Sequence, residues 1–95
     1  MRLSPHIVTE IKTCFHHVFG EGQIILFGSR VDNSLKGGDI DLYLLPEERT
    51  DLLHKKLRFL VMLKKHIGDR KIDVLIVSEN KKSIEIEAMK TGVTL

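Results

Sequence analysis

Ninety-five residues, 42% hydrophobic and 29% charged, can build one hydrophobic core, which excludes a multidomain enzyme. The net charge of +2, from 15 Lys and Arg against 13 Asp and Glu, is too small to indicate a protein that coats nucleic acid or a membrane surface. The longest apolar run, residues 59–63, is far shorter than the ~20 residues of a transmembrane helix. Because the N-terminus lacks the apolar region of a secretory signal and Cys14 is the only cysteine, we expect one soluble, cytoplasmic domain over residues 1–95.

The first half of the chain is predicted to form one helix and two strands. Ser4 followed by Pro5 is typical of a helix N-terminus, and Gly20 of a helix end. Apolar residues recur between them at helical spacing: Ile7, Ile11, Phe15, Val18 and Phe19. A short apolar run predicts a strand over 23–27, and the polar segment 30–38 predicts a surface loop. Alternating apolar and polar residues predict a second strand over 39–45, which Pro46 ends.

The second half is predicted to add a long helix, a strand and a short helix. Residues 47–67 begin with acidic and end with basic side chains, as the helix dipole favours. The apolar stripe of this helix is predicted to be Leu53, Leu57, Leu60 and Val61. Phe59 and Met62 lie off that stripe and enlarge the apolar surface, so a protein interface there is one interpretation.

A strand over 71–78 and a helix over 82–90 complete the predicted elements. Gly92 is expected to cap the last helix, leaving residues 93–95 as a tail. The predicted fold class is therefore α/β (α+β): a small mixed sheet of three main strands, with helices packed mainly on one face.

Two carboxylates on the second predicted strand are the strongest chemical signal. Asp39 and Asp41 are two residues apart, so both side chains project from one face, within reach of a common Mg²⁺ or Mn²⁺ ion. At ~5 Å and an effective dielectric constant of about 20, such charges repel by roughly 3 kcal/mol. Asp73 on the next predicted strand would increase this repulsion. An ordinary solvated sheet edge is the alternative, but these acids together favour a metal site.

A Gly-Ser turn precedes the acidic strand. Gly28 permits a tight turn and a close approach of the backbone to a phosphate, and Ser29 offers a hydroxyl group beside it. Arg30 and Lys36 in the following loop would add positive charge towards a triphosphate, although such residues are more often solvated in a loop. Tyr43 shares the strand face of the acids and either flanks the nucleotide or packs in the core.

Together these residues resemble the minimal nucleotidyltransferases of the DNA polymerase beta-like nucleotidyltransferase superfamily. Nine residues separate Gly28-Ser29 from Asp39-Ile40-Asp41, and Asp73 lies within a later apolar strand, as in members of that family. The resemblance covers nearly the whole chain. The chain departs from many relatives at Gly38, where they have Ser or Thr, and its slightly short spacer leaves the placement of Lys36 open.

The resemblance implies metal-dependent transfer of a nucleoside monophosphate, with ATP as the expected donor, to a hydroxyl group. Asp39, Asp41 and Asp73 would be the catalytic and metal-binding residues, holding two Mg²⁺ ions or Mn²⁺, and Asp73 would help to activate the acceptor. Gly28 and Ser29, with contributions from Arg30 and Lys36, would bind the phosphates. A two-metal site of carboxylates suits such an in-line displacement.

The same resemblance implies a protein partner. Relatives of this kind are commonly paired with a helical HEPN-domain protein, often a toxin, and some inactivate it by transferring AMP to it. The alternative is a non-catalytic antitoxin or interaction subunit that neutralises a HEPN-type partner by binding alone. Direct nucleic-acid binding is disfavoured, because no basic groove is visible. Whether the chain forms a homo-oligomer stays open.

Overall fold

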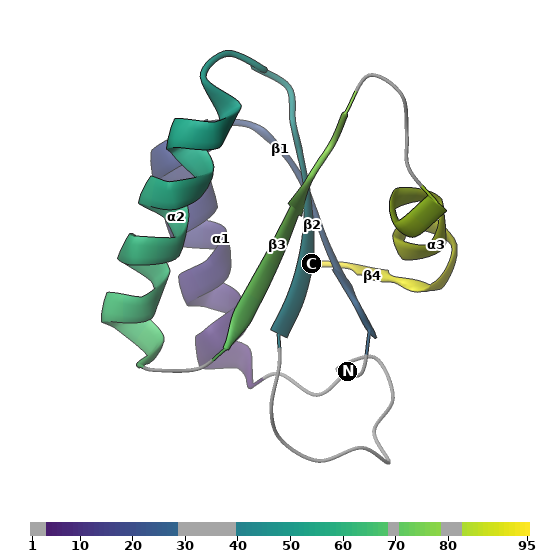
Figure 1. Cartoon of the computed structure of the whole chain (residues 1–95). Helices are drawn as coiled ribbons and strands as arrows, with labels where there is room; N and C mark the ends of the chain where they lie inside the picture. Colours follow the sequence, from purple (N-terminus) through teal and green to yellow (C-terminus); the bar gives the residue numbers. More distant parts are fainter. Residues whose placement is uncertain (1–3, 29–39, 69–70, 79–82) are drawn as a thin grey trace.

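The structure is a computed structural model that describes residues 4–28, 40–68, 71–78 and 83–95. Within these ranges the chain forms three helices and a four-stranded sheet (Figure 1). In chain order the elements are α1 (Pro5–Phe19), β1 (Gly22–Phe27), β2 (Ile40–Pro46), α2 (Leu52–Ile67), β3 (Ile72–Ile76), α3 (Ser83–Thr91) and β4 (Val93–Thr94). The predicted α+β class is confirmed.

Helix α1 begins and ends where its capping residues indicate. The backbone N–H of Ile7 donates to the hydroxyl of Ser4 at 3.3 Å, and Pro5 occupies the first turn. Gly20 ends the helix with a φ of 84°, and its N–H donates to the carbonyl oxygen of His16 at 3.0 Å. The apolar face between these caps is buried, as predicted.

The four strands lie in the order β3-β2-β1-β4. β1 pairs with β2 antiparallel, β2 with β3 parallel, and β1 with β4 antiparallel. The tail predicted after Gly92 is in fact strand β4, and the N–H of Leu95 donates to the carbonyl oxygen of Ile24 at 2.9 Å. Pairing also includes Pro46, which therefore belongs to β2, because at the end of a strand its missing N–H costs little.

Helix α2 differs from the prediction at its start and in its buried face. It begins at Leu52 instead of residue 47, because Asp51 has a left-handed backbone with a φ of 54° and the preceding residues form a turn. In that turn, Nε of Arg49 donates to the carbonyl oxygen of Pro46 at 3.1 Å. Phe59 and Leu63 are the buried residues of α2, whereas three members of the predicted core stripe are exposed: Leu53, Leu57 and Val61.

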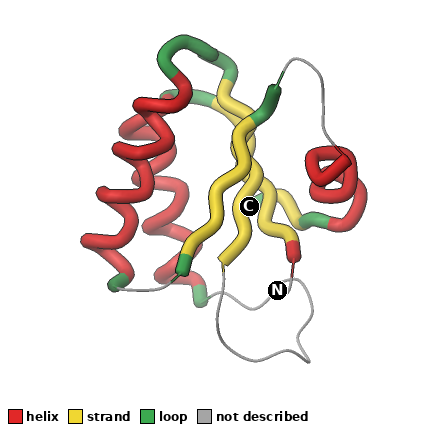
Figure 2. Tube along the Cα trace, in the orientation of Figure 1, coloured by secondary structure: helices red, strands yellow, loops and turns green. Residues whose placement is uncertain are grey.

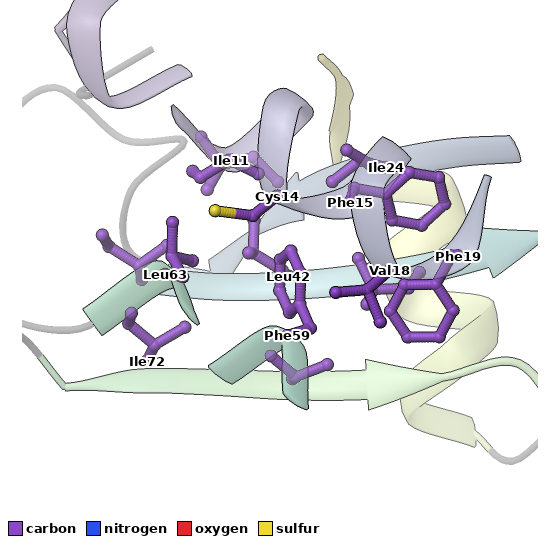
Figure 3. Packing of buried hydrophobic residues seen from close by; sticks show 14 of the residues in the cluster. Ile11, Cys14, Phe15, Val18, Phe19, Ile24, Leu42, Phe59, Leu63 and Ile72 are labelled. Atoms are coloured by element: carbon purple, nitrogen blue, oxygen red, sulfur yellow. The ribbon is translucent and has the colours of Figure 1, made fainter. Parts of the chain in front are cut away.

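Two layers of helix cover the two faces of the sheet (Figure 2). Helices α1 and α2 pack on one face, where side chains of both helices meet those of the strands (Figure 3). Helix α3 packs on the other face, where its Ala88 forms a smaller cluster with Ile25, Tyr43 and Val77. Strands β1, β2 and β3 thus divide their alternating side chains between a large core and a small one. Among the described residues, no helix is long and apolar enough to cross a membrane.

Candidate functional site

The ends of three strands meet at one edge of the sheet, the lower edge in Figure 1. Because β1 is antiparallel to β2 and β2 is parallel to β3, the end of β1 lies beside the starts of β2 and β3. Gly28 directly follows β1, Asp41 is the second residue of β2, and Asp73 is the second residue of β3. This edge therefore collects the three predicted site residues that the structure describes.

Asp41 and Asp73 are direct partners in the register of β2 and β3. Neighbouring strands lie ~4.8 Å apart, so the two carboxylates project side by side. Asp41 is half-buried and Asp73 is exposed. The residues that flank them in the strands belong to the core beneath α1 and α2: Ile40, Leu42, Ile72 and Val74. Because strand side chains alternate, both acids lie on the opposite face, the one that α3 partly covers.

Gly28 packs closely against Asp41. Its φ of 75° lies in the left-handed region, and a Cβ atom at this position would collide with a carboxylate oxygen of Asp41 and lie 3.1 Å from its Cγ. Phe27, the residue before Gly28, is the register partner of Asp41 across β1 and β2. Gly28 thus lies directly against one acid of the pair, so a group held by that acid would also meet the backbone of Gly28.

Four further predicted site residues lie outside the described residues: Ser29, Arg30, Lys36 and Asp39. Their predicted roles remain predictions. The donors that the structure does place, two neighbouring carboxylates, provide the oxygen ligands that Mg²⁺ and Mn²⁺ prefer.

Tyr43 belongs to the packing of the α3 layer. Its side chain is fully buried, and its hydroxyl donates to Oε1 of Glu85 at 3.0 Å. Burial, together with this hydrogen bond, raises the pKa of Tyr43 to about 12. Of the two interpretations of Tyr43, packing is therefore the one that the structure supports.

Glu85 on α3 is a buried acid in the same layer as Tyr43. Besides the bond from Tyr43, it accepts hydrogen bonds from the backbone N–H of Ser78 at 3.0 Å and from the Ser78 hydroxyl at 2.5 Å. These donors compensate for its burial. No sequence signal marks this role, since a glutamate beside isoleucines on a short helix is equally typical of an exposed position.

A second group of potential ligands lies between α1 and α2, on the other face of the sheet. Oε2 of Glu10 lies 3.2 Å from Nδ1 of His66, and the ligand atoms of Glu10, Cys14 and His66 lie within 4.8 Å of one another. Burial and the nearby Glu10 raise the pKa of the Cys14 thiol. Ligands of one zinc ion lie roughly 3.5 Å apart, so this cluster would have to contract around a soft ion. It is separate from the acidic edge.

A comparison with protein-family models decides the family. Residues 9–95 match the model described as polymerase beta, nucleotidyltransferase. The chain belongs to this nucleotidyltransferase family. The resemblance seen in the Gly-Ser turn and the acids is thereby confirmed at the level of a minimal nucleotidyltransferase. No curated protein matches the chain significantly.

Proposed function

We propose that this nucleotidyltransferase domain transfers a nucleoside monophosphate, AMP from ATP, to a hydroxyl group of a partner protein. The observation that carries the proposal is the pairing of Asp41 with Asp73 on one sheet face, beside the Gly28 turn. Membership of the nucleotidyltransferase family supports the reaction class. Acids that repel each other at a sheet edge are compatible with a site for divalent cations.

Asp41 and Asp73, with Asp39, would hold Mg²⁺ or Mn²⁺ in this proposal. The fit rests on the donor set, because two adjacent carboxylates offer only hard oxygen ligands. A pair of such ions, when bound, stabilises the attacking and leaving oxygens of an in-line displacement. The Glu10, Cys14 and His66 cluster has a soft thiol donor and lies on the other face of the sheet, so it is not the ion site of this reaction.

Residues at and beside the acids would bind the phosphates and accept the proton of the acceptor hydroxyl. The backbone at Gly28, with Ser29 following it, would bind the terminal phosphates. The acceptor oxygen forms a bond to the α-phosphorus of ATP, the bond from that phosphorus to the bridging oxygen breaks, and pyrophosphate leaves. The proton of the acceptor hydroxyl passes to a carboxylate oxygen of Asp73, whose exposure leaves it accessible to a bulky acceptor.

The partner in this proposal is a helical protein of the HEPN type, as the family resemblance implies. A second candidate function is a non-catalytic subunit that neutralises such a partner by docking. Exposed apolar residues on α2 favour docking in either case: Leu53, Leu57 and Val61.

Incubation with labelled ATP, MgCl₂ and the helical protein that co-purifies from the native host tests the proposal. Mass spectrometry is expected to find the mass of one nucleotide added to the partner. Asp41→Asn and Asp73→Asn should each reduce this transfer at least a hundredfold, whereas the matched control Asp51→Asn, in the turn before α2, should retain it. A partner that binds tightly and gains no mass with any nucleoside triphosphate would instead support docking alone.

A further inference from the structure

Helix α2 presents an apolar stripe away from the core. Leu53 is 73% exposed, Leu57 57% and Val61 58%. These residues are spaced four apart, so they form one continuous line along the outer face of the helix. The inner face of α2 is buried through Phe59 and Leu63, which leaves the outer stripe with no role in the core. Contiguous exposed apolar residues of this kind are typical of an interaction site.

The stripe borders a shallow groove whose remaining described lining is basic or histidine. Its volume is about 530 Å³, and besides Leu57, Val61 and Met62 it is lined by His54, Arg58, Lys65 and His66. Helix α2 as a whole contains five Lys and Arg residues and no acid, in a chain whose net charge is only +2. Helix α2 is therefore strongly positive in itself, and Arg58 and Lys65 lie in the groove beside its exposed apolar stripe.

A second groove extends this surface to β3. Its volume is about 310 Å³, and its described lining consists of Leu52, Leu53, Lys56, Val74, Leu75, Ile76 and Val77. β3 is the outermost strand on that side of the sheet. Leu53 belongs both to the stripe and to this second groove. The two grooves and the stripe therefore form one surface, which we call the α2/β3 face.

The positive charge and aliphatic surface of the α2/β3 face indicate which kind of partner can bind there. A second copy docked through the same face would place Lys and Arg against Lys and Arg, which is unfavourable. Single-stranded nucleic acid needs stacking platforms, whereas the exposed stripe is aliphatic. A membrane-surface helix buries a broad apolar face of Trp, Phe and Leu in the lipid interface. The exposed apolar face of α2 is instead a single line of Leu53, Leu57 and Val61, because Phe59 is fully buried in the core.

We propose that the α2/β3 face is a docking site for an amphipathic helix of a different protein, with an apolar stripe bordered by Asp and Glu. The apolar stripes would supply the buried contact, and the acidic borders would pair with Arg58 and Lys65. This partner would lie beside β3, the strand that carries Asp73. If the proposed function holds, a partner docked on this face would present its acceptor hydroxyl to Asp41 and Asp73.

Photo-cross-linking in the native host tests the docking face. Val61→p-benzoylphenylalanine is compared with Lys90→p-benzoylphenylalanine, because Lys90 is exposed on α3, on the other side of the sheet. Mass spectrometry of the adducts is expected to map position 61, and not position 90, to an acidic amphipathic segment of another protein. An adduct with a second copy, with RNA or with lipid, or no adduct at position 61, would overturn the proposal.

A charge substitution gives an independent measurement with the captured partner. Leu57→Glu should weaken binding at least tenfold, because it removes an apolar contact and adds a charge that repels an acidic border. Ile86→Glu on α3, where Ile86 is 48% exposed, is the matched control and should leave binding unchanged. A Leu57→Glu variant with unchanged circular dichroism and full affinity would refute the docking face.

The docking proposal and the enzymatic proposal can be refuted independently of each other. Asp41→Asn should abolish nucleotide transfer and leave the position 61 adduct intact. An adduct without transfer by the native chain refutes the enzymatic proposal only. Transfer to a partner that never cross-links at position 61 refutes the docking face only.

Discussion

The missing side chain of Gly28 is what lets the backbone at the end of β1 lie against Asp41. The carboxylate of Asp41 occupies the place that a Cβ atom of residue 28 would take. The same residue has a positive φ, which glycine adopts without strain. The position of Asp41 beside its register partner Asp73 therefore depends on a residue with no functional group of its own.

We expect Gly28→Ala to reduce nucleotide transfer at least tenfold, because the new methyl group displaces the Asp41 carboxylate. Positive φ alone should also lower the free energy of unfolding by roughly 1–2 kcal/mol. Gly68→Ala is the matched control, since Gly68 has a φ of 86° and open space around it. Urea denaturation and the transfer assay on both variants separate the effects. Equal activity of the two variants would show that the contact between Gly28 and Asp41 does not matter.

Part of the candidate site follows from alternation along the strands. Strand periodicity places Asp41 and Asp73 on the face opposite Leu42 and Val74, and the structure has them there. Alternation does not reveal which strands are neighbours, so the direct pairing of the two acids needed the fold. Nor could sequence separate the two interpretations of Tyr43, because its hydroxyl bonds to Glu85, 42 residues away in the chain.

Among the elements, α2 shows most clearly how packing chooses between two apolar stripes. Residues 59–63 are all apolar, so helical periodicity in this region fits more than one buried face. The structure buries Phe59, whose ring centroid lies 6.0 Å from that of Phe19 on α1. An aromatic ring contributes more buried area than the leucines of the other stripe, and α1 offers it an aromatic partner. This information is not local to the helix, which explains why Leu60 of the predicted stripe packs against the core while its other three members are exposed.

Alanine substitutions on the two faces of α2 should give very different stabilities. Phe59→Ala is expected to lower the free energy of unfolding by about 3–5 kcal/mol, because it leaves a cavity in the core. Leu57→Ala should change it by less than ~0.5 kcal/mol, since that side chain is mostly exposed. Urea denaturation followed by circular dichroism measures both. A large loss for Leu57→Ala with a small loss for Phe59→Ala would mean that the helix is rotated and that the stripe belongs to the core.

The molecule as a whole is a sheet between two unequal layers, and its smaller layer has a polar contact at its centre. Glu85 on α3 accepts hydrogen bonds from Tyr43 on β2 and from Ser78 beyond β3. The order of the elements predicted helices mainly on one face of the sheet, and α1 and α2 do pack there. The place of α3 could not be predicted in this way, because its contact with the sheet depends on a buried glutamate. Strand β4 was also missed, since two residues are too few for a periodic signal.

Because of this buried contact, the free energy of unfolding should fall at alkaline pH. The pKa of Tyr43 is about 12 in the folded chain and about 10 when unfolded, so the stabilisation is complete below pH 10 and is lost as pH rises from 10 to 12. The expected loss by pH 12 is about 2 kcal/mol, and Tyr43→Phe should remove this part of the pH dependence while lowering stability at neutral pH by roughly 1–2 kcal/mol. Because Tyr43 is the only tyrosine and the chain has no tryptophan, tyrosinate absorbance reports its titration directly. A midpoint near 10 in the folded protein would show that the hydroxyl is not held by Glu85 in a buried layer.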